Sequence, residues 1–527
     1  MANKKLFKTI AEKMMPKANT VNEAGGRAYK LSPKAALAQY AITGCLNGTF
    51  YADAQTQLQK VIELSKQVDA VFIAQLALYA RERGHMKDMP ALLCAVLAVK
   101  DVSMLKAVFL RVIDNGRMLR NFVQMIRSGA VGRHSLGTAP KRLINEWLEA
   151  RSDETIFKDS VGQSPSLADV IKMIHPKPKT ESRAALYGYF IGRDFNAQAL
   201  PALVRQFEQF KAGESLEVPK VPFQMLTSLP LGTKDWTEIA RNAAWQMTRM
   251  NLNTFARHGV FEQPGLADLI ANRLRDEEAI KKARVFPYQL MAAFQNTGQA
   301  TPDNKVPANV RDALQDAMEI ATRNVPKVEG KVYVFPDVSG SMHSPVTGHR
   351  GGATSQVRCI DVAALVAATV LRQNPQAEVI PFSDNVVQAD LNPRDSVMTN
   401  AEKLAGLPSG GTNCSAPLRE LNRRKARGDL VIYVSDNESW VDGSARGWMA
   451  ERATATTEQW AEFKRRNPQA RLVCIDIQPY ATTQAQTRED ILNIGGFSDQ
   501  VFDVIADFAA GRLAADHWIC VIASVTL

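Results

Sequence analysis

The stretch YVFPDVSGSMHSP, residues 333 to 345, ends an apolar run with one carboxylate and two hydroxyls at alternate positions. These side chains are Asp337, Ser339 and Ser341. Oxygen ligands at this spacing, directly after a predicted strand, suit a hard cation such as Mg²⁺. They equally suit an ordinary strand-to-loop turn, because Asp, Ser and Gly are common turn residues. The choice depends on what the rest of the chain places beside them.

Two later segments supply further oxygen side chains. Thr412 lies in the glycine-rich stretch LPSGGTNCS, and Asp436 follows the apolar run DLVIYVS. In an open α/β sheet, ligands bind at the carboxyl ends of the strands, so we expect all five side chains to converge there. Two carboxylates with three hydroxyls fit Mg²⁺ or another divalent cation, and water or a partner's carboxylate would complete the octahedron.

The C-terminal part of the chain contains the elements that would position this site. Short apolar strands are predicted in KVYVFP, AEVIPF, DLVIYVS and RLVCIDI. Helices are predicted between them in RCIDVAALVAATVLRQ, SAPLRELNRRKAR and TATTEQWAEFKRR. Strands that alternate with helices indicate a doubly wound α/β domain, which we place at residues 329–512.

The preceding domain is placed at residues 20–328, and its pattern is helical almost throughout from about residue 34 to 320. The segments PKAALAQYAITGCL, QTQLQKVIELSKQV, AVFIAQLALYARERG and MPALLCAVLAV have apolar residues at helical spacing and end at polar or glycine breaks. Recurring helix pairs with short connections are typical of a HEAT-type solenoid. No fixed sequence period accompanies this rhythm.

Composition indicates a folded intracellular protein of two or three domains, with 527 residues of which 46% are hydrophobic. Its six cysteines form no Cys-x-x-Cys pair, which fits a reducing, cytoplasmic compartment. No signal peptide and no apolar run near the ~18 residues of a membrane span is apparent. The C-terminal WICVIASVTL is interpreted as a docked tail or a strand.

Positive charge is concentrated in the helical part. Residues 1–330 contain 45 Lys and Arg against 32 Asp and Glu, a net charge of +13, whereas the remainder has a net charge of −3. Residues 111–142 contain seven basic side chains and one acid, Asp114. Such a cluster favours a polyanionic partner over an ordinary solvated helix face, in which charges of both signs alternate.

The five oxygen residues resemble the metal-ion-dependent adhesion site of von Willebrand factor A domains, Asp-x-Ser-x-Ser followed by a distant Thr and Asp. The stretches GGTNCSAPL, VSDNESW, GGFSDQVFDVI and, in the helical part, KKARVFPYQLMAAF also resemble the Ro autoantigen family. In that family a TROVE module of helical repeats precedes a von Willebrand A domain. The resemblance implies a ring-shaped protein that binds small noncoding Y-like RNAs outside and misfolded RNA ends in its hole. An exoribonuclease or another protein is then a candidate partner; DNA and membranes are not expected.

The resemblance also suggests RNA contacts in two stretches. In residues 127–148 the candidates are Arg127, Arg133, His134, Lys141 and Arg142, and in residues 167–178 they are Lys172, His175 and Lys177, with Lys179 added as a weaker candidate. Ala168 stands where the family has a lysine, and the loop after Ser341, which contains His343 and His349, is longer than in the animal proteins.

Two other function classes remain open at the level of sequence. A protein-adhesion module would use the cation to hold a partner's carboxylate. An enzyme is disfavoured, because aspartate-nucleophile phosphatases need a second Asp where this chain has Ser339, and no Walker loop or nucleophilic triad is apparent. We therefore predict no catalysis.

Overall fold

The computed structural model describes residues 15–44, 46–283, 287–298, 305–323, 327–348, 357–440, 453–496, 499–511 and 517–527. The chain divides into two compact units. The first, called the sheet unit below, comprises Met1–Val68, Phe286–Ala292 and Met318–Ser524. The second, called the helical unit, comprises Asp69–Val285, Ala293–Ala317 and Val525–Leu527.

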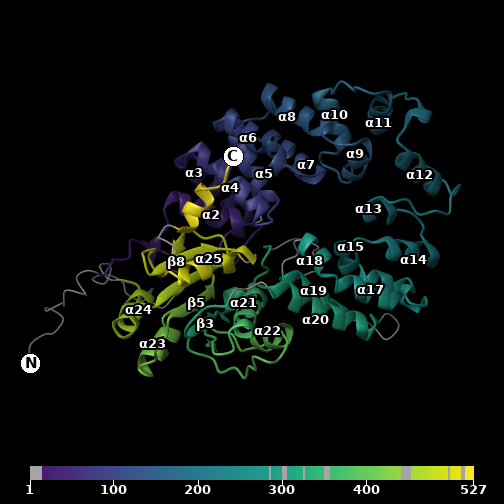
Figure 1. Ribbon diagram of the computed structural model, residues 1–527. Helices are drawn as coiled ribbons and strands as arrows, with labels where there is room; N and C mark the ends of the chain where they lie inside the picture. The colour runs from purple at the N-terminus through teal and green to yellow at the C-terminus, as the bar shows by residue number, and fades with distance from the viewer. Residues whose placement is uncertain are drawn as a thin grey trace, which may run out of the picture. The chain divides into compact units, whose positions relative to one another are not determined.

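The sheet unit is built on five parallel strands in the order β4-β3-β5-β6-β8 (Figure 1). The strands are β3 (Val332–Pro336), β4 (Glu378–Val379), β5 (Leu430–Ser435), β6 (Arg471–Asp476) and β8 (Ile491–Gly495). The α/β domain and four of its strands are thereby confirmed. Strand β8 was not predicted, because its sequence ILNIG is short and carries a central Asn.

Helices cover both faces of this sheet. They are α21 (Cys359–Gln373), α22 (Val397–Ala405), α23 (Ala416–Arg423), α24 (Ala455–Arg466), α25 (Asp499–Ala509) and α26 (His517–Ala523). On one face Trp460 and Phe463 of α24 pack with Tyr433 of β5 in a fully buried core. The alternate strand residues point to the other face, where α21 packs on β3 and β5. Burial on both faces explains why the strands are continuously apolar.

The N-terminal residues pack in the sheet unit. A hairpin of β1 (Thr20–Val21) and β2 (Arg27–Lys30) pairs with β7 (Thr482–Thr483) to form a small antiparallel sheet. The helices α2 (Pro33–Thr43) and α3 (Ala54–Gln67) follow. Residues 20–68, which the sequence placed with the helical repeats, therefore lie in the sheet unit, because β2 finds its partner strand there.

The described part of the helical unit is all α, as predicted. Its helices are α4 (Ala70–Glu82), α5 (Asp88–Lys100), α6 (Val102–Val112), α7 (Gly116–Arg127), α8 (Thr138–Glu149), α9 (Asp153–Asp159), α10 (Leu167–Ile174), α11 (Glu181–Ile191), α12 (Ala202–Lys211), α13 (Phe223–Leu226), α14 (Thr233–Asn242), α15 (Trp245–Met250), α16 (Leu252–Arg257), α17 (Leu266–Leu274) and α18 (Glu277–Ala283). Two further helices, α19 (Pro287–Gly298) and α20 (Ala308–Thr322), precede β3.

Polar residues define where many of these helices begin. Asp69 accepts a hydrogen bond from the backbone N–H of Phe72 at the start of α4, and Asn115 does the same for Met118 at α7. Ser166 and Asp169 form a reciprocal capping box at α10. Such caps accept hydrogen bonds from backbone N–H groups that have no partner inside the helix. Asp, Asn and Ser residues in the sequence therefore mark where these helices begin.

The C-terminal segment is a helix followed by a docked tail, so the strand alternative was wrong. Residues His517–Ala523 form α26. Beyond it, the carbonyl of Val525 accepts a hydrogen bond from Gln75 at 3.3 Å, and that of Thr526 accepts one from Arg111 at 2.7 Å.

Candidate functional sites

Two neighbouring strands of the parallel sheet end at the predicted metal residues. Asp337 follows β3 and Asp436 follows β5, and the two strands are paired in register from Val332 and Leu430 onward. The backbone N–H of Asp337 donates to the carbonyl of Val434 at 3.0 Å, which carries the pairing past the end of β3. Parallel pairing thus places both carboxylates at the same edge of the sheet.

The two serines reach the same edge through a tight turn. Asp337 Oδ1 accepts a hydrogen bond from the backbone N–H of Ser339 at 2.9 Å, and a short 3₁₀ helix, η4 (Gly340–His343), follows. The hydroxyl oxygens of Ser339 and Ser341 lie 3.3 Å apart. Burial raises the pKa of Asp436. A hydrogen bond between the Ser341 side chain and the Asp436 carboxylate partly offsets this increase.

The loop with Thr412 closes against this turn. The backbone N–H of Gly340 donates to the carbonyl of Gly410 at 2.9 Å, and Gly411 N donates to the Asp384 carboxylate at 2.8 Å. A Cβ at Gly410 or Gly411 would collide with the Asp384 carboxylate, so a larger residue at either position would require Asp384 to shift. All five predicted residues are buried at this edge of the sheet.

Both carboxylates of this cluster have pKa values above the usual range. Burial, and then the charge of Asp436, raises the pKa of Asp337 to about 7. Burial also raises the pKa of Asp436. Two adjacent carboxylates in a dry environment are costly unless a positive charge lies between them. The donor set, two carboxylates and three hydroxyls, fits a hard divalent cation. Within the described residues no three His, Cys, Asp or Glu side chains surround a common metal position, so hydroxyls would have to supply the remaining protein ligands.

Sequence reasoning missed several groups around this cluster. Ser435 donates its hydroxyl to Asp337 Oδ2 at 2.6 Å and so orients the carboxylate. Tyr51, far away in the sequence, forms a side-chain hydrogen bond with Ser341, and its ring lies 5.9 Å from that of Tyr480. A polar residue that closes a strand, as Ser435 closes β5, is a signal that sequence reading could have used; nothing local marks Tyr51.

Glu438, two residues after Asp436, was also missed. It is fully buried, and its carboxylate accepts hydrogen bonds from the backbone N–H groups of Glu23 at 2.7 Å and Ala24 at 3.4 Å. Its other oxygen accepts from the Thr482 hydroxyl at 3.2 Å. Burial and the nearby Asp436 raise its pKa to about 8. The loop that carries Asp436 therefore also holds the N-terminal hairpin.

The longer loop after Ser341 is described only in part. His343 lies in η4, and its Nδ1 is 3.1 Å from the Arg358 guanidinium. His349 lies outside the described residues.

In the helical unit, four predicted RNA residues line one cavity of about 800 Å³, called the large cavity below. They are Arg127 at the end of α7, His134 in the following loop, and Lys141 and Arg142 on α8. All four are exposed, and the His134 ring occupies the space beside Gly129 where a side chain would lie. These side chains come from α7, α8 and the loop between them; their contact with RNA stays a prediction.

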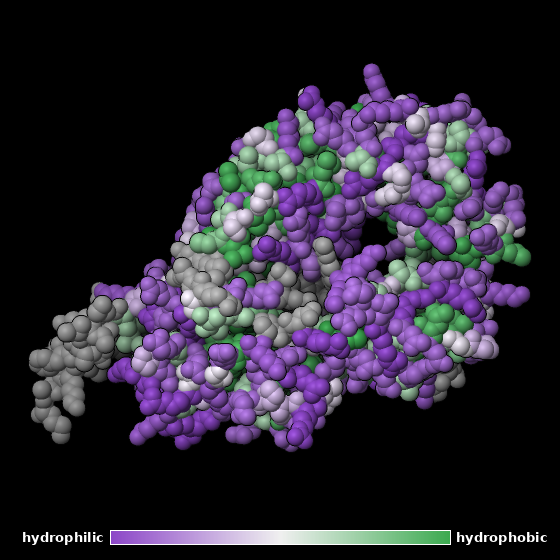
Figure 2. Space-filling view, in the orientation of Figure 1, coloured by the Kyte–Doolittle hydropathy of each residue, from purple (hydrophilic) through white to green (hydrophobic). Residues whose placement is uncertain are grey.

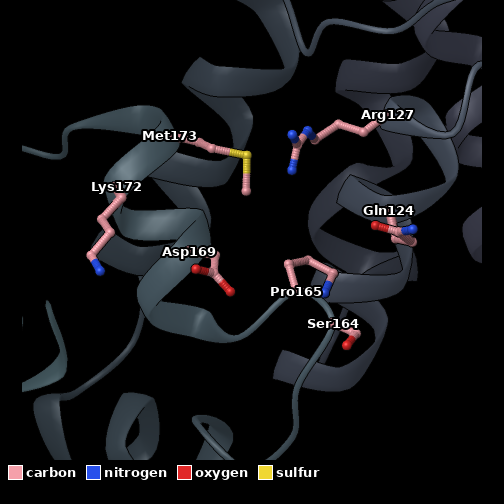
Figure 3. Close-up of a pocket in the computed structure, with 7 residues that line it drawn as sticks. All are labelled: Gln124, Arg127, Ser164, Pro165, Asp169, Lys172 and Met173. Atoms are coloured by element: carbon pink, nitrogen blue, oxygen red, sulfur yellow. The ribbon is translucent and has the colours of Figure 1, made fainter.

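A second cavity of about 380 Å³, the small cavity, adjoins the first (Figure 3). It is lined by Gln124, Arg127, Ser164, Pro165, Asp169, Lys172 and Met173. Arg127 and Met173 line both cavities. Lys172, a predicted residue, belongs to this one.

Other basic candidates have different surroundings. Arg133 donates to the carbonyl of Ala98 at 3.1 Å and lies against Gly137, and it lines neither cavity. His175 ends α10 in the left-handed conformation with φ of 49°. Lys177 is exposed, and Lys179 pairs with Glu149 at 2.7 Å.

Part of the basic run from residue 111 to 142 has a structural role. Arg111 pairs with Glu82 at 3.0 Å. Arg120 is buried and donates to the carbonyl of Asp159 at 2.9 Å. The excess of positive charge is therefore larger in the sequence than on the surface.

In the part of the chain that the structure describes, no helix combines the length and the hydropathy of a membrane span.

Comparisons with known proteins cover both units. Residues 140–297 match the TROVE domain, and residues 331–509 match the Ro60 vWA domain. The chain is 24% identical over 522 residues to the RNA-binding protein RO60 of Deinococcus radiodurans, covering 93% of this chain and 95% of that protein. It is 22% identical over 296 residues to the RNA-binding protein RO60 of Caenorhabditis elegans, covering 55% of this chain and 44% of that one.

The fold is similar to a solved structure, the crystal structure of the Deinococcus radiodurans RO (RSR) protein. The TM-score is 0.63 at 20% identity, and the match covers 92% of this chain and 100% of the other. With a TROVE domain followed by a Ro60-type von Willebrand A domain, the chain belongs to the Ro family.

Proposed function

We propose that this chain is an RNA-binding protein that forms a ribonucleoprotein with small noncoding RNAs of the Y-like kind and binds the single-stranded ends of misfolded RNA. The observation that carries the proposal is the large cavity, where Arg127, Lys141 and Arg142 converge from two helices. Two relatives named as RNA-binding proteins support it.

The chemistry of this surface suits RNA phosphates. Within the described residues, the three cationic side chains form no hydrogen bond or ion pair, and exposed guanidinium and ammonium groups bind phosphate directly. The face of the molecule seen in Figure 2 is mainly hydrophilic, with hydrophobic residues in scattered groups. Such a surface favours an electrostatic mode of binding over an apolar one.

The proposal is tested by purifying the protein from its native cell and sequencing the RNA that accompanies it, and then by gel shifts across salt. If about five phosphates of a single strand are contacted, log affinity should fall with log salt at a slope of roughly −3.5. Protein free of RNA, together with a flat salt response, would contradict RNA binding.

The sheet unit is proposed to bind Mg²⁺ or another divalent cation in a metal-ion-dependent adhesion site. Asp337 and Asp436 would hold the ion, with Ser339, Ser341 and Thr412 as the hydroxyl donors. A bound cation would neutralise the buried carboxylates and offer an open coordination position to an oxygen ligand.

Catalysis is not part of this proposal; the protein is proposed to act in the cytoplasm as a scaffold in noncoding RNA quality control. An exoribonuclease or another protein could be recruited through the RNA or the metal site. The alternative, a metal-dependent protein-adhesion module on a helical docking surface, is favoured only by the sheet-edge site. Retention of a protein partner that depends on Asp337 and persists after ribonuclease treatment would favour this alternative.

A further inference from the structure

The small cavity combines apolar and polar groups in an arrangement unlike that of a simple phosphate site. Gln124 and Arg127 come from α7, and the remaining lining residues come from the loop before α10 and its first two turns. Figure 3 shows Gln124 and Arg127 on one side, Asp169 and Met173 on the other, and Pro165 between and below them. Lys172 points away from the centre of the cavity. The groups that face the centre are therefore one cation, one carboxylate, one amide and two apolar side chains.

The size and lining suit a flat heteroaromatic ring. A volume of about 380 Å³ lies at the lower end of the roughly 300 to 1,000 Å³ of small-molecule pockets, and a duplex would not fit. Met173 and Pro165 provide apolar contact, and the planar Arg127 guanidinium can stack on a base or donate to its edge. Unpaired bases of single-stranded RNA are recognised by contacts of this kind.

The Asp169 carboxylate has one oxygen engaged and one available. Oδ2 accepts hydrogen bonds from the backbone N–H and the hydroxyl of Ser166, at 2.8 and 2.7 Å. These bonds, with smaller contributions from Lys172 and Arg127, lower the pKa of Asp169. Among the described residues, Oδ1 accepts no hydrogen bond. An ionised Oδ1 can only accept, so a ligand group that binds it must be a donor, such as the N–H of a base.

We propose that the small cavity takes one unpaired guanine of a bound RNA, with Asp169 Oδ1 accepting from its N1–H and 2-amino groups. Arg127 or the Gln124 amide donates to the O6 carbonyl. This inference rests on the proposed RNA-binding function and adds a base preference to it.

Guanine fits because two donors lie side by side on its Watson–Crick edge, next to one acceptor. Uracil offers a single donor flanked by two carbonyls, and these would repel the carboxylate. Adenine and cytosine each offer one amino group beside a ring nitrogen that accepts. The Asp169 acceptor and the Arg127 or Gln124 donor face each other across the cavity. They therefore complement guanine better than the other three bases.

The experiment uses the full-length protein and fluorescence anisotropy at low salt. The probes are 12-nucleotide oligouridines, either unmodified or with one central uridine replaced by guanosine, adenosine or cytidine. We expect the guanosine probe to bind at least about fivefold more tightly than the others, the lower bound for a good bidentate base contact.

Two variants remove the preference by different routes. In Asp169→Asn the amide oxygen keeps the Ser166 contacts, and the amide N–H₂ replaces the free acceptor by a donor. The guanosine preference should vanish, while affinity for plain oligouridine should stay equal or rise. Gln124→Ala, on an exposed face of α7, should reduce the preference without affecting folding.

Asp235→Asn is the matched control. Asp235 caps α14 by accepting from the backbone N–H of Gly232 at 2.8 Å and lines neither cavity. Its variant should keep the full preference.

The outcomes separate this inference from the proposed function. RNA binding without base preference, or an unchanged preference in both Asp169→Asn and Gln124→Ala, would overturn the guanine pocket alone. Loss of the preference in Asp235→Asn would overturn it as well, because the effect would then be unspecific. Failure of every probe to bind would overturn RNA binding itself, and the guanine pocket with it.

Discussion

The sheet-edge site and the cavities of the helical unit place functional residues in opposite ways. At the sheet edge the side chains are buried, and hydrogen bonds hold Asp337 from two directions. At the large cavity the side chains are exposed, and among the described residues Lys141 and Arg142 form no side-chain hydrogen bond. The first arrangement suits a small ion that requires fixed ligands. The second suits a flexible polyanion that many arrangements of charge can satisfy.

The difference also affects how each site should respond to mutation. Removing one fixed ligand should abolish binding of an ion, whereas RNA binding should decline in proportion to the charge removed. Four predictions test this contrast, ordered from the largest expected effect to the smallest.

The largest effect is expected from reversing the charges at the large cavity. Arg127→Glu, Lys141→Glu and Arg142→Glu together should weaken RNA binding at least about a hundredfold, and the salt slope should become shallower by about 2, because each lost phosphate contact contributes roughly 0.7. The melting temperature should change by no more than a few degrees, since exposed charges contribute little to folding.

A matched triple variant of exposed cations outside both cavities, Lys158→Glu, Arg193→Glu and Lys234→Glu, is the control for net charge. Gel shifts and circular-dichroism melts measure both variants. Equal loss of affinity in the two would mean that net charge, not the cavity, determines RNA binding.

The second prediction concerns the cation. Mg²⁺ or Mn²⁺ at a hundred times its dissociation constant should stabilise the wild-type protein by about 2.7 kcal/mol. Asp337→Ala should remove that gain without unfolding the metal-free protein, because it also relieves repulsion from Asp436. RNA affinity should be unchanged.

Thermal melts with chelator and with added metal measure this effect. Asp395→Ala, which removes a surface partner of Lys403, should respond to metal like the wild type. A full metal response in Asp337→Ala would show that the motif is only a turn.

The third prediction tests whether the buried Glu438, at the edge of the sheet, holds the N-terminal hairpin in place. Glu438→Ala removes the acceptor for the backbone N–H groups of Glu23 and Ala24. Those two amides should exchange with deuterium about fivefold faster, because the raised pKa keeps Glu438 largely neutral at pH 7 and a net hydrogen bond to a neutral group is worth about 1 kcal/mol. Exchange in the helical unit should not change.

Glu462→Ala, at a partly exposed ion pair with Arg466, is the comparison variant for hydrogen exchange by mass spectrometry. Unchanged exchange at residues 22–26 in Glu438→Ala would mean that the pairing of β2 with β7 alone holds the hairpin.

The smallest effect separates two arginines that look alike in the sequence. Arg133→Ala should destabilise the helical unit by about 1 kcal/mol, because it removes the bond to the Ala98 carbonyl. Arg142→Ala should leave stability within about 0.5 kcal/mol, as for most exposed positions. In gel shifts Arg142→Ala should weaken RNA binding more than Arg133→Ala does; the reverse order would place Arg133 at the RNA. Urea titrations followed by circular dichroism measure the stabilities.

Local sequence was sufficient to predict those features whose geometry depends on the backbone alone. Continuous apolar runs predicted β3, β5 and β6, and parallel pairing brings every residue that follows such a strand to the same edge of the sheet. Asp337 and Asp436 could therefore be grouped across 98 intervening residues. Helices of the repeat region were readable because Asp, Asn and Ser caps punctuate them.

Tertiary packing alone decided which side chains share a surface. Arg127 lines both cavities, whereas Arg133, six residues later, turns back to the Ala98 carbonyl and lies against Gly137. The same limit applies to the N-terminal hairpin, whose partner β7 lies more than 450 residues away in the sequence. The spacing of hydrophobic residues indicates which face of a helix or strand is buried. Contacts between distant elements depend on how their shapes pack together, which cannot be predicted from either segment by itself.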